Sequence, residues 1–116
     1  MKKKLLVLGA SGMIGYTMTK VLSEKKNWQI TGIVRNLKFL KNLKAKNVNF
    51  IIHNYKHSNL DSLKNIITSI NPDIVINCSG VTKQRINLDK LSEIIFLNSL
   101  LPHLISSVCE KIRARY

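Results

Sequence analysis

The chain has 116 residues and a formal net charge of +13, from 19 lysines and arginines against six acidic residues. At this length we expect one domain, covering residues 1–116. Hydrophobic residues make up 45% of the sequence and charged residues 22%, which excludes a disordered chain. No uninterrupted apolar run approaches about 18 residues, so the sequence predicts no membrane span. Cys78 and Cys109 lie in apolar runs and make no disulfide framework, so we expect reduced thiols and a cytoplasmic location.

The positive charge is concentrated in the first half of the chain. Residues 1–60 contain twelve Lys and Arg with one acid, Glu24, whereas residues 61–116 contain seven with five acids. Such a charge is typical of proteins that bind nucleic-acid or membrane phosphates. However, Lys, Asn and Ile supply 42 residues, as A/T-rich coding would produce, and few aromatic residues are available to stack on bases. We therefore expect neither nucleic acid nor a membrane as a partner.

The apolar pattern predicts strands that alternate with helices. The strands are expected over residues 4–8, 28–34, 48–52 and 73–78. The helices are expected over residues 12–26, 37–46, 59–70 and 88–112. The first helix has an apolar face made of Met13, Ile14, Met18, Val21 and Leu22. This alternation indicates an α/β fold of three layers, a Rossmann-like doubly wound parallel sheet with strand order 3-2-1-4.

Residues 9–15 read Gly-Ala-Ser-Gly-Met-Ile-Gly, a GxxGxxG motif between the first strand and the first helix. In this context Gly9 turns the chain off the strand, Gly12 lets the backbone approach a pyrophosphate, and Gly15 lets the helix pack closely on the strand. The helix N-terminus then offers N–H groups and a positive dipole end to phosphates. The motif predicts a dinucleotide site. The alternative is three glycines that serve only a tight turn and close packing.

Arg35 follows the second strand, twenty residues after the last glycine of the motif. At this position an acidic residue accepts a hydrogen bond from the ribose of NAD, whereas an arginine accommodates the 2′-phosphate of NADP. No Asp or Glu occurs between Glu24 and Asp61, and Asn36 extends the polar rim. We therefore expect NADP rather than NAD, the alternative being a solvated loop arginine. Asn54, after the third strand, offers an amide where the adenine amino group is expected.

Several segments together resemble one enzyme superfamily. They are residues 9–15, 34–36, 71–81 and 98–103, which read GASGMIG, VRN, NPDIVINCSGV and NSLLPH. Over residues 4–116 the chain is similar to the extended short-chain dehydrogenase/reductases. Within them it looks closest to the dTDP-4-dehydrorhamnose reductases and the related nucleotide-sugar epimerases and dehydratases.

The resemblance implies two groups of cofactor contacts. The residues that would line the pyrophosphate are Ser11, Met13 and Ile14. The residues that would pack along the adenosine and nicotinamide riboses are Cys78, Ser79 and Gly80. In the resembling enzymes an Asn on the last helix also helps to organise the active site, which adds Asn98.

Pro102 lies four residues after Asn98 and affects the hydrogen bonding of its carbonyl group. Proline has no N–H group, so the carbonyl of Asn98 loses its helical partner and the helix should kink. The alternative to a role in the site is a kink that only shapes packing.

The catalytic residues of the resembling family do not occur at their expected place. That family uses a Ser or Thr and a Tyr-x-x-x-Lys helix turn, all after a fifth strand, and this chain stops at about the first residue of that strand. The one Tyr-x-x-x-Lys match, from Tyr16 to Lys20, falls on the first helix, and we treat it as accidental. His53, His57 and His103 have no metal-ligand spacing.

The sequence as a whole predicts the NADP-binding N-terminal part of a nucleotide-sugar reductase or epimerase, truncated and not catalytic alone. A non-catalytic module that senses NADP(H) is the alternative. A nucleotide sugar is the expected substrate if a full-length enzyme exists. Loss of the fifth strand would leave the edge of strand 73–78 unpaired, which predicts self-association.

Overall fold

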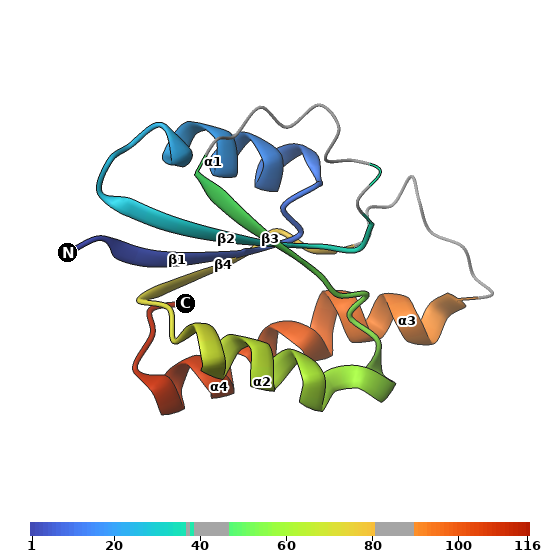
Figure 1. Ribbon diagram of the computed structural model, residues 1–116. Coiled ribbons are helices and arrows are strands. Elements are labelled where there is room, and N and C mark those ends of the chain that lie inside the picture. Colours follow the sequence, from blue (N-terminus) through green and yellow to red (C-terminus); the bar gives the residue numbers. More distant parts are fainter. Residues whose placement is uncertain (37, 39–46, 81–89) are drawn as a thin grey trace.

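A computed structural model describes residues 1–36, 38, 47–80 and 90–116 of the chain, and it contains a four-stranded parallel sheet (Figure 1). The strands are β1 (Lys3–Leu8), β2 (Trp28–Val34), β3 (Val48–Ile52) and β4 (Ile74–Asn77). Their order, β3-β2-β1-β4, confirms the predicted Rossmann-like topology. The helix expected over residues 37–46 lies outside the described residues.

Helices cover both faces of this sheet (Figure 1). One face carries α1 (Met13–Ser23), and the opposite face carries α2 (Leu60–Ile70) and α4 (Leu101–Ile112). A 3-10 turn, η2 (His57–Asn59), precedes α2. The helix α3 (Leu91–Ile95) and a π-helical turn, η5 (Phe96–Leu100), lead directly into α4.

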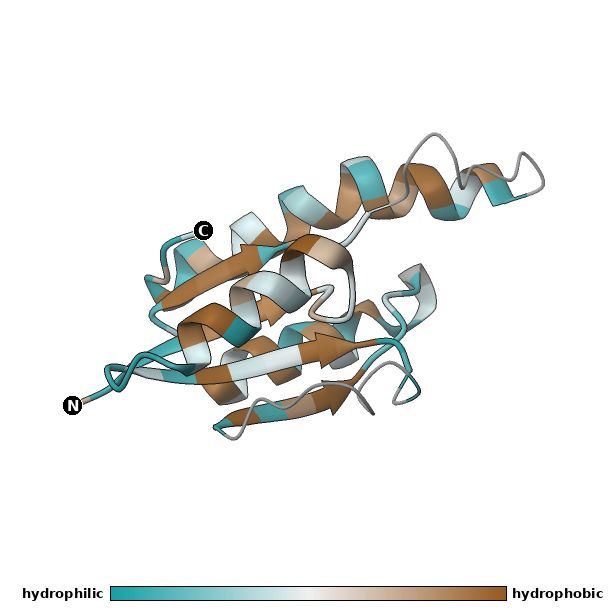
Figure 2. Ribbon diagram, turned by 90° about the horizontal axis from the view of Figure 1, so that it is seen from above, coloured by the Kyte–Doolittle hydropathy of each residue, from teal (hydrophilic) through white to brown (hydrophobic). Residues whose placement is uncertain are grey.

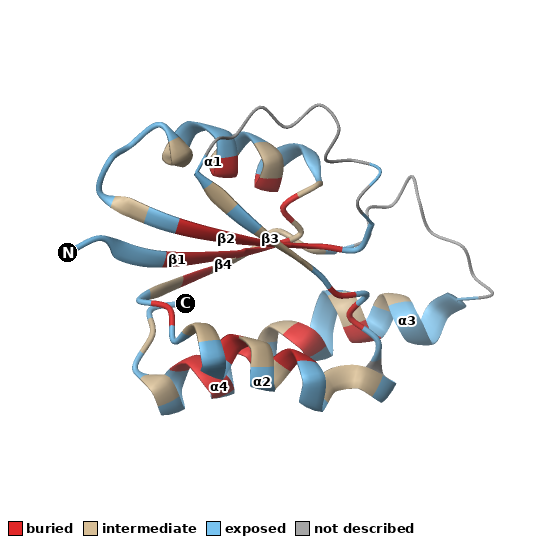
Figure 3. Cartoon of the chain, in the orientation of Figure 1, coloured by how far each residue is buried: buried red, intermediate tan, exposed pale blue. Residues whose placement is uncertain are grey.

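The central strand β1 sets the register of its neighbours. Leu6 lies opposite Thr31 of β2 and Val75 of β4. Residues 5–8 are all buried, because helices cover both faces of the strand (Figure 3). Since the strands are parallel, their carboxyl ends meet at one edge of the sheet. The turns that follow all four strands therefore come together there, which is where ligands bind in open α/β sheets.

The sheet separates two hydrophobic clusters, and the strands between them are apolar along most of their length (Figure 2). The larger cluster lies on the α2 and α4 face and includes Leu6, Leu8, Ile33, Tyr55, Leu63, Ile67, Val75, Phe96, Leu101, Ile105, Val108 and Cys109. The smaller cluster lies on the α1 face and consists of Leu5, Val7, Ala10, Ile30 and Val34. Most large buried side chains thus support α2 and α4 and not α1.

The predicted apolar face of α1 is only partly buried. The buried residues of this helix are Gly15 and Thr19, whereas Met13 is 85% exposed, Ile14 65% and Val21 50%. The reason is the close approach of the helix to the end of β1, where a Cβ on Gly15 would lie 2.2 Å from the carbonyl oxygen of Gly9. Small residues therefore face the sheet at this approach. Of the predicted apolar face, Met18 and Leu22 are half-buried, and Leu22 packs against the smaller cluster.

The chain beyond α4 returns to the sheet at the outer side of β4. Val75 donates its N–H to the carbonyl of Arg115 at 2.8 Å, and Arg115 donates its N–H to the carbonyl of Asp73 at 2.9 Å. This pairing is a parallel bridge between Ile74 and Arg115. Arg115 therefore lies beside β4 on the outer side of the sheet, at the place where the sequence predicts a fifth strand to begin. Self-association through this edge stays a prediction.

One helical stretch, Leu91–Ile112, is 22 residues long and contains an 18-residue window with a mean hydropathy of 1.4, which is enough to cross a membrane by length and composition alone. Polar residues interrupt it, so a search for unbroken apolar runs does not find it. Its residues Phe96, Leu101 and Ile105 belong to the larger hydrophobic cluster. Core helices of globular domains pass the same criterion, so the absence of a membrane partner stays a prediction.

Candidate functional site

The candidate site begins at Gly9, which ends β1 with a φ of +72°. A side chain has no room here, because a Cβ on Gly9 would lie 2.7 Å from the backbone of Cys78 and Ser79. The turn is held by backbone hydrogen bonds. Ala10 donates its N–H to the carbonyl of Ile33 at 3.1 Å, and Gly12 donates to Gly9 at 3.1 Å. Only glycine can occupy position 9 without strain.

The N-terminus of α1 follows the turn directly. Tyr16 donates its N–H to the carbonyl of Gly12 at 2.8 Å, which is the first bond of the helix. The N–H groups of residues 13–15 precede this bond and have no acceptor within the helix. No side chain caps the helix at Gly12. Such a terminus, with its positive dipole end, suits an anionic group.

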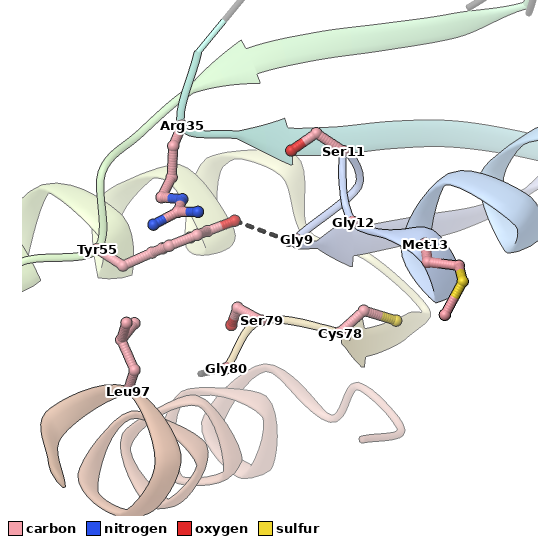
Figure 4. A pocket seen from close by; sticks show the side chains of 10 residues that line it. All are labelled: Gly9, Ser11, Gly12, Met13, Arg35, Tyr55, Cys78, Ser79, Gly80 and Leu97. Carbon is pink, nitrogen blue, oxygen red and sulfur yellow. Dashed lines mark hydrogen bonds between the residues drawn. The ribbon is translucent and has the colours of Figure 1, made fainter. Parts of the chain in front are cut away.

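The turn opens into a cavity of about 210 Å³ (Figure 4). Its lining residues come from the turns after β1, β2, β3 and β4, from the start of α1 and from η5; they are Gly9, Ser11, Gly12, Met13, Arg35, Tyr55, Cys78, Ser79, Gly80 and Leu97. All of these except Tyr55 and Leu97 were predicted from the sequence. Tyr16 and Lys20 do not line this cavity, so the accidental Tyr-x-x-x-Lys match lies outside the site.

Three predicted residues lie near the cavity without lining it. Gly15 is buried beneath the glycine turn, where its missing side chain permits the close contact described above. Ile14 lies on the first turn of α1 with its side chain 65% exposed. The side-chain oxygen of Asn36 accepts the N–H of Lys38 at 2.9 Å.

Asn54 lines a second cavity of about 680 Å³ next to the first. The two cavities share Arg35, Tyr55 and Leu97. The second one extends between the loop after β3 and the helical stretch α3–η5, where Ile95 and other apolar side chains line it. A flat, largely apolar group with a polar edge fits such a lining.

Asn98 lies within the π-helical turn η5. Leu101 donates its N–H to the carbonyl of Phe96, five residues earlier, so a π-helical turn lies just before Pro102, while the predicted kink stays a prediction. A Cβ on Gly80 would lie 3.2 Å from the side-chain oxygen of Asn98. Asn98 therefore reaches the turn after β4 but does not line the cavity.

The turn after β4 is ordered by Asn77. The side-chain oxygen of Asn77 accepts the backbone N–H of Ser79 at 3.0 Å and also the hydroxyl of Ser79. Cys78 donates its N–H to the carbonyl of Leu8 at 2.8 Å, which ties this turn to β1. Ser79 and Gly80 are thereby held opposite the glycine turn (Figure 4).

Only three side chains that line the first cavity can titrate: Arg35, Tyr55 and Cys78. Burial raises the pKa of Tyr55 far above its ordinary range, although the hydrogen bond from Gly9 and the charge of Arg35 act to lower it. Burial also raises the pKa of the Cys78 thiol. Near neutral pH the tyrosine and the cysteine are thus uncharged. Arg35 gives the cavity a net positive charge, which fits phosphate groups.

Sequence reasoning missed Tyr55 and Leu97. Tyr55 follows β3 at the carboxyl edge of the sheet, and this topological position is the signal that could have found it. Leu97 carries no such signal, because a leucine on a predicted helix is an ordinary packing residue. Among the residues that the structure describes, no group of three His, Cys, Asp or Glu could hold a metal ion.

The sequence was compared with models of known protein families, and one model matches most of the chain. The model of the saccharopine dehydrogenase NADP-binding domain matches residues 5–89. No curated protein sequence matches the chain. The structural neighbours described below share the Rossmann-like fold with this chain. The finer resemblance to dTDP-4-dehydrorhamnose reductases is not confirmed.

The fold is similar to several solved structures at low sequence identity. PbgP3 from Burkholderia pseudomallei has a TM-score of 0.79 and 18% identity, over 98% of this chain and 37% of that one. WbmH from Bordetella bronchiseptica, in complex with NAD+, has a TM-score of 0.77 and 19% identity, over 98% and 37%. UDP-N-acetylglucosamine 4-epimerase from Methanobrevibacter ruminantium M1 has a TM-score of 0.73 and 18% identity, over 98% and 36%. The chain thus spans a little over a third of these proteins.

Proposed function

The chain belongs to the saccharopine dehydrogenase NADP-binding domain family, and from this membership we propose that its paired cavities bind NADP. The observation that carries the proposal is the positively charged cavity between the glycine turn and Arg35. The pyrophosphate would lie against the N-terminus of α1, where N–H groups lack helical acceptors. Ser79 and Gly80 would flank a ribose, since they line the opposite wall.

Arg35 is the residue that we propose selects NADP over NAD. It is exposed, it lies one residue after β2, and it lines both cavities. A guanidinium group is suited to a phosphate because it can donate two parallel hydrogen bonds. No carboxylate lies within residues 25–60 to accept a hydrogen bond from an unphosphorylated ribose. The adenine would then enter the larger cavity, near the amide of Asn54.

We further propose that binding, and not hydride transfer, is what residues 1–116 do by themselves. The side chains that line the first cavity offer no acid or base near neutral pH, because Tyr55 and Cys78 hold their protons. The neighbours include a nucleotide-sugar epimerase and span nearly three times this length. A nucleotide-sugar oxidoreductase is therefore the whole-protein activity that we favour. A non-catalytic NADP(H) sensor is the second candidate, because the same lack of an acid or base fits it.

Isothermal titration with NADP and NAD, for the wild type and for Arg35→Asp, tests the binding proposal. We expect the wild type to prefer NADP by about tenfold or more, because a charge-assisted hydrogen bond contributes roughly 1.5–3 kcal/mol. Arg35→Asp should lose this preference and bind NAD at least as well as NADP. Lys20→Asp is the matched control, since it makes the same charge change on an exposed residue that lines neither of the two cavities.

Two results would contradict the proposal. If the wild type binds neither dinucleotide, the cavities do not have this function. If Arg35→Asp keeps the preference for NADP, or if Lys20→Asp loses it to the same degree, Arg35 does not select the cofactor.

A further inference from the structure

Tyr55 is the one lining residue of the first cavity whose hydroxyl joins two strand ends. Its hydroxyl accepts the N–H of Gly9 at 2.9 Å and donates to the carbonyl of Ile33 at 3.0 Å. Gly9 begins the glycine turn, and Ile33 lies two residues before Arg35. One oxygen atom thus bridges the proposed pyrophosphate site and the strand that carries the proposed 2′-phosphate site (Figure 4).

The position of Tyr55 is itself tightly determined. The residue is only 4% exposed, and its ring belongs to the larger hydrophobic cluster. Its backbone has a φ of 48°, in the left-handed region that side chains rarely adopt. Its N–H donates to Nδ1 of His53 at 3.1 Å, and Nε2 of that histidine lies 3.2 Å from the hydroxyl of Ser62. Left-handed backbone at a buried residue costs free energy and persists when its surroundings demand it.

We infer that Tyr55 is a positioning residue that sets the separation between the glycine turn and Arg35, and so matches the two anion sites to one dinucleotide. This inference rests on the proposed function. The carbonyl of Ile33 also accepts the N–H of Ala10, so the hydroxyl of Tyr55 completes a three-way junction of β1, β2 and the loop after β3. Without that hydroxyl, the glycine turn would keep the Ala10 bond to the end of β2 but would lose its connection through the loop after β3.

The spacing matters only for a ligand that occupies both sites at once. A ligand that bridges two sites gains affinity when the sites are held at its own span, and it loses that gain when they move apart. NADP carries a pyrophosphate and a 2′-phosphate, so it should be sensitive to Tyr55. Adenosine 2′-monophosphate carries only the group for Arg35 and the adenine, so it should not be.

The first measurement needs no ligand. In the wild type we expect the amide of Gly9 to exchange with solvent deuterium as slowly as amides of the central strand β1. In Tyr55→Phe, which keeps the buried ring, exchange at Gly9 should be faster by about tenfold, because the amide has lost its acceptor. Fast exchange at Gly9 in the wild type would overturn the inference even if the variant did not fold.

The second measurement compares two ligands by calorimetry or by competition. Tyr55→Phe should weaken NADP by about tenfold and change adenosine 2′-monophosphate by less than about twofold. The control is Tyr116→Phe, which removes the hydroxyl of a residue that is 46% exposed. The contact of this hydroxyl with Asn77 is a long 3.4 Å, so the variant should leave both affinities unchanged.

The outcomes separate this inference from the proposed function. If the wild type binds NADP and Tyr55→Phe binds it equally well, the inference is wrong and the proposed function stands. An equal loss of both ligands would also overturn it, because Tyr55 would then only maintain the fold. If the wild type does not bind NADP, the proposed function falls and the inference falls with it.

Discussion

The two faces of the sheet are packed by different means. On one face α1 approaches β1 through Gly15 and Thr19, and three of its larger apolar residues, Met13, Ile14 and Val21, are exposed. The hydroxyl of Thr19 is satisfied within the helix, by the carbonyl of Gly15 at 2.6 Å. On the other face α2 and α4 bury branched side chains, which include Leu63, Ile67, Leu101 and Ile105.

This difference in packing indicates that one face mainly stabilises the fold and the other mainly positions the candidate site. Apolar burial stabilises in proportion to the area removed from water, so the α2 and α4 face should supply most of the stability. The α1 face buries less but places the helix N-terminus within reach of the glycine turn. Changes on the first face should therefore affect binding most, and changes on the second should affect mainly stability.

The largest effect is expected for Gly15→Ala. The new Cβ would lie 2.2 Å from the carbonyl oxygen of Gly9, and backbone must move to make room for it. Moving the helix N-terminus would cost NADP two or more charge-assisted hydrogen bonds, which corresponds to a loss of affinity of more than about hundredfold. Overpacking should also lower the free energy of unfolding by about 1–3 kcal/mol. Calorimetric titration and urea unfolding measure the two effects.

Gly12→Ala is the matched control for that prediction. A Cβ here meets only the carbonyl oxygen of Gly9 at 3.4 Å, which is an ordinary contact, and the backbone φ of −72° suits alanine. We expect the stability of Gly12→Ala to be close to that of the wild type, while the methyl group hinders the phosphates and weakens NADP. An unchanged affinity in both variants would remove the glycine turn from the proposed site.

On the opposite face, Ile67→Ala should lower stability and leave binding intact. Ile67 is 1% exposed in the larger hydrophobic cluster, so its truncation leaves a cavity and should cost about 3 kcal/mol of unfolding free energy. Under conditions where the variant is folded, its affinity for NADP should stay within about twofold of the wild type. Ile66→Ala, on the same helix but half-buried, should cost clearly less. A loss of affinity in folded Ile67→Ala would show that the two faces are not separable.

Most of the fold could be predicted from the sequence, because each strand reads as a short and mostly apolar run. The ranges predicted for β2 and β3 match the observed ones, and that of β1 differs by one residue. The central strands β1 and β2 are buried over most of their length, as continuous apolar runs predict, whereas β3 lies at the edge of the sheet and has no fully buried residue. The buried face of α1 could not be read in this way, because two small residues and not the apolar ones decide how the helix packs.

The candidate site was predictable only where local backbone chemistry marks it. The glycines and Arg35 follow from the turn and from the end of β2, and eight of the predicted residues do line the first cavity. Tyr55 could not be found locally, since its hydroxyl acts on Gly9, 46 residues away in sequence. Its left-handed backbone is equally invisible, because Tyr is not a residue that favours that region.

The smallest effect is expected from pH, through the histidine that lies between Tyr55 and α2. His53 lies just after β3, and its ring contacts Tyr55 on one side and Ser62 of α2 on the other. Since Nδ1 accepts the N–H of Tyr55, the neutral ring with its proton on Nε2 fits this site. Burial lowers the pKa of His53 below its ordinary value of 6.5, although a hydrogen bond with the backbone of Asn59 acts in the opposite direction.

A lowered pKa means that the unfolded chain binds a proton at His53 more readily than the folded chain does. The contribution of His53 to stability should therefore be complete above about pH 6.5, and it should be lost as the pH falls through the folded pKa. The loss cannot exceed about 1.4 kcal/mol per pH unit, the limit for one proton. His53→Asn keeps an acceptor side chain but does not titrate, so the difference between its urea-unfolding profile and that of the wild type isolates this histidine from His57 and His103. Parallel profiles from pH 7 to pH 5 would show that protonation of His53 does not disturb the junction that holds Tyr55.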